Sequence, residues 1–132
     1  MKHHKASPLF TLFMMMLLSP LTTIAGELLS GDEIEALFSN RTFEGIHLKN
    51  GWTFKNYAGS DGGCNVLFLS GKKRDQTRLY RWYVKDNMHC CDTGRRKICG
   101  TISNEGNGVY HKHRNGKKHI QTFMNFIEGR QL

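Results

Sequence analysis

The sequence is poor in the features that mark most enzymes and membrane proteins. It has two prolines and four cysteines in 132 residues, and its longest apolar run is well short of the roughly 20 residues that a membrane-spanning helix needs. It contains no phosphate-binding loop, nucleophile elbow, H-E-x-x-H zinc motif or dinucleotide fingerprint. The length excludes a multidomain enzyme with a nucleotide-binding half. With 39% hydrophobic and 11% aromatic residues the chain is not of the disordered class, so we expect one compact domain.

The first 25 residues have the pattern of a secretory signal peptide. A short basic start around Lys2 is followed by an apolar run over residues 9–18, and small residues occupy positions −3 and −1 relative to a cleavage site after Ala25. We therefore expect a secreted or periplasmic mature domain, residues 26–132, without a transmembrane segment.

Charge is unevenly distributed along the mature chain. Residues 26–63 carry three basic and six acidic residues, whereas residues 64–132 carry fourteen basic and five acidic residues. This imbalance favours contacts with polyanions. The alternative is an ordinary solvated surface on which positive and negative charges happen to separate along the chain. Two basic runs at predicted hairpin tips supply the candidate polyanion-binding residues: Lys72, Lys73, Arg74, Arg114, Lys117 and Lys118.

The mature chain begins with the signature of a short helix. Ser30 and Glu33 match a capping box, and Ile34, Leu37 and Phe38 form an apolar stripe at helical spacing. Asn40 is suited to a left-handed C-terminal position. A helix of about two turns is not stable alone, so we expect it to pack as a lid on a sheet.

The rest of the sequence is predicted to be mainly β. Apolar and polar residues alternate in short segments, which are separated by Asn-Gly pairs and other glycine-containing turns typical of hairpins. No helical segment is available for a parallel crossover. The pattern predicts an antiparallel meander or a small up-and-down barrel of about eight strands. The predicted strands are residues 42–48, 52–57, 65–70, 78–85, 88–91, 97–103, 109–113 and 120–127.

Alternation also predicts which side chains point into the barrel. In the strand 78–85, the set that contains Tyr80 and Trp82 is the more apolar one, so we expect it to face inward, with Trp82 in the core. In the last strand neither of the two alternating sets of side chains is cleanly polar, so the pattern does not predict which set faces inward.

A set of short motifs runs along almost the whole mature chain: the segments 29–34 and 37–38 with Thr42, Gly45, Phe54, Asp61-Gly62, residues 81–84, Cys90, Cys99, residues 106–110 and residues 123–129. Together these motifs resemble a family of small secreted bacterial proteins, which is itself similar to lipocalin- or avidin-like barrels and has no established activity. The resemblance supports the barrel fold and implies no mechanism, and Cys64 and Cys91 depart from the family pattern.

The four cysteines, Cys64, Cys90, Cys91 and Cys99, all lie in the exported part, where disulfides are the default. Neighbouring strand residues point to opposite faces, so a bond between Cys90 and Cys91 is disfavoured. We favour Cys90–Cys99 together with Cys64–Cys91, with the swapped pairing as the second choice.

The alternative for the cysteines is a metal site. His89 lies beside Cys90, and His111 and His113 share one strand face, but their spacing matches no known zinc pattern. We expect no metal or cofactor, with His111 and His113 as the candidate ligands if one binds.

Three functions follow from these features. We favour an exported, non-catalytic binding protein that holds a small apolar ligand or lipid inside the barrel, and an empty apolar interior would support it. The second is an interaction module for protein or for an anionic envelope component, which would show a filled interior and a clustered positive face. Nucleic acid is disfavoured by export. The third is a small secreted hydrolase or ribonuclease, which requires converging histidines. The candidate ligand-binding residues are Tyr80, Trp82, Tyr110 and Phe123, and the candidate hydrolase histidines are His47, His111, His113 and His119.

Overall fold

The computed structural model describes residues 26–132, so the predicted signal peptide lies outside the described residues. Eight antiparallel strands, β2 to β9, form a closed barrel, because β7 pairs with β8 and completes the ring. The prediction of a mainly β, barrel-like domain of about eight strands with one short helix is confirmed. The elements are β1 (Glu27–Leu28), α1 (Gly31–Phe38), β2 (Arg41–His47), β3 (Thr53–Ala58), β4 (Gly63–Phe68), β5 (Thr77–Lys85), β6 (Met88–Asp92), β7 (Lys97–Gly106), β8 (Val109–Arg114) and β9 (Lys118–Glu128).

The turns use the residues that tight hairpins require. Both Asp86 and Asn87 have positive φ angles of 51° and 56°, and the β8–β9 turn places Asn115 and Gly116 at 52° and 68°. Asn, Asp and Gly adopt this left-handed conformation at low cost, which matches the right-handed twist of the flanking strands. The turn residues in the sequence therefore mark most of the strand boundaries.

The predicted capping box at the start of α1 is present. Ser30 Oγ accepts a hydrogen bond from the Glu33 amide at 3.2 Å, and the Ser30 amide donates to Glu33 Oε1 at 3.0 Å. These bonds to Ser30 lower the pKa of Glu33. The Gly31 amide donates to Asn87 Oδ1 at 2.7 Å, which joins the helix start to the β5–β6 turn. Asn40 has φ 57°, as predicted for the residue that ends the helical segment.

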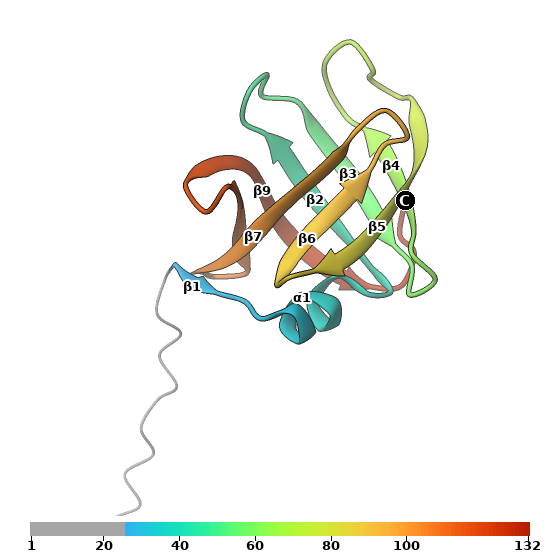
Figure 1. Ribbon diagram of the computed structural model, residues 1–132. Helices are drawn as coiled ribbons and strands as arrows, with labels where there is room; N and C mark the ends of the chain where they lie inside the picture. Colours follow the sequence, from blue (N-terminus) through green and yellow to red (C-terminus); the bar gives the residue numbers. More distant parts are fainter. Residues whose placement is uncertain (1–25) are drawn as a thin grey trace, which may run out of the picture.

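Helix α1 closes one end of the barrel (Figure 1). Ile34 and Phe38 are completely buried, whereas Leu37 is half-buried. The ring of Phe38 contacts the rings of Phe43 and Phe123 edge-on, with centroids 5.1 and 5.4 Å apart. The apolar stripe of the helix is therefore part of the barrel core, and the predicted lid is confirmed.

Two features of the strands differ from simple alternation. Phe123 and Phe126 both contact the Phe38 ring, because a register shift and Asn125, at φ 56°, interrupt the alternation in β9. This bulge explains why neither face of the last strand is cleanly polar in the sequence. The two-residue strand β1, too short to show a period, pairs with β7 at positions 103–104.

The antiparallel meander sorts the connections into two groups. The loops β2–β3, β4–β5, β6–β7 and β8–β9 must lie at one end of the ring, and the helix and the remaining turns lie at the other. We call the end with these four loops the basic end, after its cations, and the end with the helix the helix end. Within residues 26–132, no helix is both long and apolar enough to cross a lipid bilayer.

Candidate functional site

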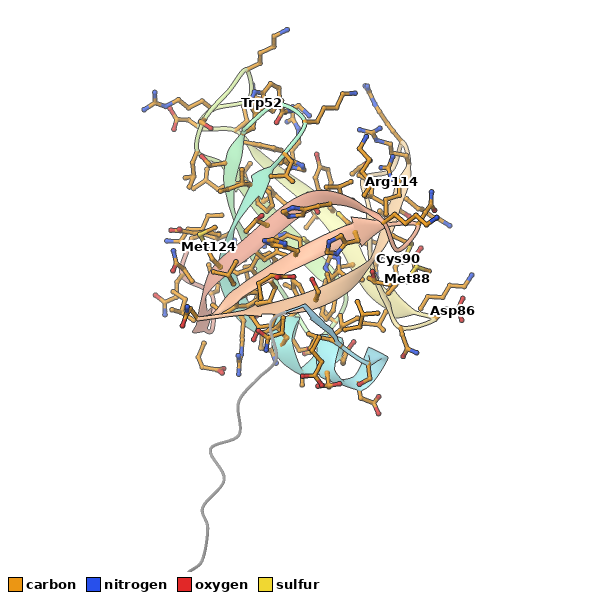
Figure 2. All side chains as sticks on the ribbon, turned by 90° about the vertical axis from the view of Figure 1, so that its left-hand side faces the viewer. Trp52, Asp86, Met88, Cys90, Arg114 and Met124 are labelled. Atoms are coloured by element: carbon orange, nitrogen blue, oxygen red, sulfur yellow. A yellow bond between two sulfur atoms is a disulfide. The ribbon has the colours of Figure 1, made fainter. Side chains whose placement is uncertain are left out.

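The two predicted polyanion-binding runs come together at the basic end. One lies in the β4–β5 loop and the other around the β8–β9 turn, and two further loops of the same end add cations that the sequence analysis did not include. Figure 2 shows Trp52, from the β2–β3 loop, and Arg114, the last residue of β8, at the end opposite α1. The ten cations of this end are Lys49, Lys72, Lys73, Arg74, Arg95, Arg96, Lys97, Arg114, Lys117 and Lys118.

These cations are free to meet a partner. Nine of the ten are exposed, and the tenth, Lys73, places Nζ 5.3 Å from the centre of the Phe68 ring. Two acids, Asp75 and Asp92, accompany them. Both ion pairs found among residues 26–132 involve other residues: Arg41 with Glu128, and His111 with Glu105. The basic end therefore has a large net positive charge that nothing in the described chain neutralises.

Apolar side chains lie among these cations. Leu48 and Leu69 are 44% and 40% exposed, on the β2–β3 and β4–β5 loops. The β4–β5 loop is bound to the first residue of β3, which follows the β2–β3 loop: the Thr53 amide donates to Ser70 Oγ at 2.9 Å and the Leu69 amide donates to the Thr53 carbonyl at 2.9 Å. The basic end thus combines cations with two exposed leucines on neighbouring loops.

The helix end has the opposite charge. Its helix, turns, C-terminal segment and terminal strand residues carry three cations, Arg41, Lys85 and Arg130, against six acids: Asp32, Glu33, Glu35, Asp61, Asp86 and Glu128. The imbalance along the sequence therefore becomes a separation in space, with positive charge at one end of the barrel axis and negative charge at the other.

The barrel interior is largely filled by side chains. Trp82 and Phe123 are 4% and 2% exposed and belong to the core, and the Trp82 indole donates to the Gly59 carbonyl at 2.8 Å. Tyr110 packs against Phe126, with ring centroids 5.5 Å apart. Of the four predicted ligand-binding residues, Tyr80 and Phe123 line the interior cavity, and the structure does not bring all four to one pocket.

The remaining cavity is small. Its volume is about 50 Å³, and its lining includes His47, Phe54, Tyr80, Cys91 and Gln121. Pockets for small organic ligands usually measure roughly 300–1,000 Å³, so this space holds water-sized molecules. A wider depression of about 390 Å³ lies on the outside at the helix end, beside Glu35, Asp61 and Arg81.

The predicted disulfide between Cys90 and Cys99 is present; the two residues are a direct cross-strand pair of β6 and β7. The prediction of a second disulfide needs correction, because Cys64 and Cys91 are thiols in this structure. They lie on the two strands that flank β5, Cys64 opposite Tyr80 and Cys91 opposite Trp82, and the Cys64 thiol donates to Asn56 Oδ1 at 2.9 Å.

Lys112 is a buried cation that the sequence analysis did not single out. Its side chain is 0% exposed, and its ammonium donates to His89 Nδ1 and to the Ile98 carbonyl, each at 2.9 Å. Gly100 makes room for its stem, since a Cβ on that residue would lie 2.9 Å from Lys112 Cγ. Burial lowers the pKa of Lys112 to about 8. Burial and the Lys112 charge hold the pKa of His89 well below its usual range.

Three of the four predicted hydrolase histidines gather on the outer surface. The rings of His111 and His119 are stacked with centroids 3.7 Å apart, and His113 lies 5.5 Å from His119. His119 Nε2 is within 3.0 Å of Thr122 Oγ1, and burial with the neighbouring His111 lowers its pKa. His47, the fourth, lines the interior cavity, so the four do not converge. Among residues 26–132, no group of three or more ligating side chains is arranged to hold a metal ion, His111 and His113 included.

No family model matches this chain, and neither a curated protein nor a solved structure was found to match it.

Proposed function

We propose that the mature domain is exported and docks on anionic lipid surfaces through its basic end. The observation that carries this proposal is the gathering of ten cations, accompanied by two acids, on four loops of one end and on the strand residues that adjoin them. Each Lys or Arg near an anionic bilayer contributes on the order of 1 kcal/mol, so a few of these side chains acting together give useful affinity.

The two exposed leucines favour a lipid surface over other polyanions. Leu48 and Leu69 lie on two cation-bearing loops at the same end of the barrel, so they reach the interface along with Lys49 and Lys72. Burying apolar side chains among lipid headgroups adds to the electrostatic attraction, whereas a sulfated glycan or a nucleic acid backbone offers them little apolar surface. A ligand inside the barrel is not part of the proposal, because the cavity is only about 50 Å³.

Vesicle co-sedimentation tests the proposal. We expect binding to phosphatidylcholine vesicles that contain phosphatidylglycerol, weak binding to pure phosphatidylcholine, and release by salt because screening shortens the reach of the charges. Replacing Lys72, Lys73 and Arg74 together by Gln should reduce binding at least about tenfold, given the per-residue contribution above. The matched control replaces three cations outside the basic end by Gln, with the same change of net charge: Lys55, Arg81 and Lys85.

Substitution of the two leucines distinguishes a lipid surface from other polyanions. We expect Leu48→Ser with Leu69→Ser to weaken vesicle binding and to leave retention on a heparin column unchanged. Retention on heparin or single-stranded nucleic acid without vesicle binding would replace lipid by another polyanion. If the triple variant and its control lose vesicle binding equally, net charge alone accounts for the binding, and the proposal of a docking surface at the basic end is wrong.

A further inference from the structure

The buried ammonium of Lys112 has no opposite charge beside it. Its side chain is completely buried, and its two hydrogen-bond acceptors are His89 Nδ1 and the Ile98 carbonyl. Both acceptors are uncharged, since burial and the Lys112 charge hold the pKa of His89 well below its usual range. Neither ion pair found among residues 26–132 includes Lys112. A buried charge is costly unless an opposite charge compensates it, so this ammonium lacks a partner.

Two buried side chains have N–H groups without a protein acceptor. The Lys112 ammonium carries three N–H groups, and the described part of the chain supplies two acceptors for them. Asn56 is 7% exposed, and its Oδ1 accepts the Cys64 thiol at 2.9 Å. The side-chain nitrogen of Asn56 has no acceptor among residues 26–132. Both groups can therefore donate to a bound molecule.

These donors lie around the interior cavity. His89 and Ile98, which hold the Lys112 ammonium, both line the cavity, and so does Asn56. Gln121, the cross-strand partner of Lys112 on β9, is a further lining residue. The positive charge of Lys112 therefore lies beside the cavity wall.

The cavity has no negative side chain to balance that charge. Among residues 26–132, no Asp or Glu lines it; its titratable lining residues are His47, Tyr80, His89 and Cys91. Burial and then the Lys112 charge lower the pKa of both histidines, so both are neutral at pH 7. Burial raises the pKa of Tyr80, which keeps its hydroxyl group protonated. An anion in this cavity would be attracted by Lys112 and repelled by no carboxylate.

The cavity adjoins the surface at the basic end. Three of its lining residues, Tyr80, Thr93 and Ile98, are half-buried, and Thr93 belongs to the β6–β7 loop of that end. The same loop carries the exposed cations Arg95 and Arg96. Positive charge around an opening raises the local concentration of anions, so the loops of the basic end favour their entry.

We propose that the interior cavity binds one small inorganic anion of the halide class, held by the charge of Lys112 and by the side-chain amide of Asn56. The anion supplies the opposite charge that Lys112 lacks and accepts the free N–H groups. A chloride or bromide ion is close to a water molecule in size and fits a volume of about 50 Å³, whereas lipid headgroups and phosphate esters do not. The site is separate from the lipid-docking surface and does not rest on it.

The charge of Lys112 makes binding depend on pH. Burial lowers the pKa of Lys112 to about 8, so the ammonium is present at pH 7 and is lost above pH 8. Because the protonated form binds the anion, the apparent affinity should fall by up to about tenfold for each pH unit above 8. Arg114 stays charged throughout this range. Ionisation of Cys64 or Cys91 would also repel the anion, so Cys91→Ser is used below to separate the two effects.

Crystals of the protein soaked in sodium bromide test the site directly. We expect an anomalous bromide peak inside the cavity, within hydrogen-bond reach of Lys112 Nζ or Asn56 Nδ2, and its absence in Lys112→Met. Bromide found on the exposed side chains of the basic end, with water alone in the cavity, would overturn the proposal.

Thermal unfolding tests the site in solution. When sodium bromide replaces sodium gluconate at equal ionic strength, we expect the Tm of the unmodified protein to rise relative to that of Lys112→Met, because a bound ion stabilises the folded state and gluconate is too large to enter. Lys85→Met, which removes an exposed lysine outside the basic end, is the matched control and should respond like the unmodified protein. A bromide peak in crystals without this difference in Tm would mean an adventitious ion only, and the proposal would be wrong.

Cys91→Ser separates a bound anion from a thiolate as the counter-charge of Lys112. We expect this variant to bind bromide at pH 7 and to lose the effect of bromide on Tm between pH 8 and pH 10. Bromide binding that appears in Cys91→Ser and is absent from the unmodified protein would show that a Cys91 thiolate already balances Lys112, which overturns the proposal. If Lys112→Met does not fold, this pH dependence decides: an effect of bromide that is equal at pH 7 and pH 10 contradicts a role for the ammonium.

Discussion

The indole ring of Trp52 occupies the position where a side chain on Gly71 would begin. A Cβ built on Gly71 would lie 2.5 Å from atoms of this ring, closer than carbon atoms approach in folded proteins. The two residues come from different loops of the basic end, β2–β3 and β4–β5, and Gly71 also has a positive φ of 82°. The contact and the backbone both require glycine here.

Gly71→Ala is therefore expected to destabilise the protein. The clash with Trp52 forces the two loops apart, and overpacking of this kind costs about 1–3 kcal/mol in addition to the strain of the positive φ. Gly94→Ala is the matched control, since Gly94 has a similar φ of 86° and no atom within 4 Å of an added Cβ. The free energy of unfolding in urea measures both; equal losses would mean that the Trp52 contact contributes nothing.

Phe38 on the lid helix should be the most sensitive residue of α1. It is completely buried among Phe43, Phe123 and Phe126, so Phe38→Ala leaves a cavity and is expected to cost about 3–5 kcal/mol. Leu37→Ala, one position earlier and half-buried, should cost clearly less. Thermal or urea unfolding compares the two, and a larger loss for Leu37 would show that the helix is seated differently.

Stability should fall in mild acid because buried histidines resist protonation. Burial and then the Lys112 charge hold the pKa of His89 well below its usual range, and burial first lowers that of His47. Below about pH 6.5 the unfolded chain takes up protons that the folded protein does not, so the free energy of unfolding decreases as the pH falls. Denaturant titrations near pH 7 and pH 5 measure this.

A substitution of His89 tests whether this residue causes the loss of stability in mild acid. We expect His89→Gln to reduce the loss of stability between the two pH values by up to about 1.4 kcal/mol per pH unit below 6.5. His113→Gln, on the outer surface of β8, serves as the control. If His89→Gln leaves the pH dependence unchanged, the buried histidine does not cause it.

Most of the fold was predictable because local chemistry and the global fold agree. The capping box at Ser30, the Asn-Gly turns and the alternation around Trp82 each specify one structure from a few neighbouring residues. The bulge at Asn125 was not predictable, because an isolated asparagine in a strand does not by itself indicate a left-handed backbone.

The candidate sites were less predictable, since they depend on residues far apart in the sequence. The two basic runs were evident, but Arg95 and Arg96 join them only because every second connection of a meander lies at the same end. Lys112 stands between two histidines in a basic run and looks like a solvated residue. Its inward position follows from its pairing with Ile102 and from the space left by Gly100, neither of which a single sequence reveals.

The pairing of β1 with β7 has a consequence for how copies of this protein associate. Because the ring is closed, the free backbone edge within residues 26–132 is that of β1, which is two residues long. Fibril growth needs a longer exposed ladder of amide and carbonyl groups as a template. Concentrated solutions should therefore resist amyloid formation for as long as the barrel stays folded, and any aggregation should begin from unfolded chains.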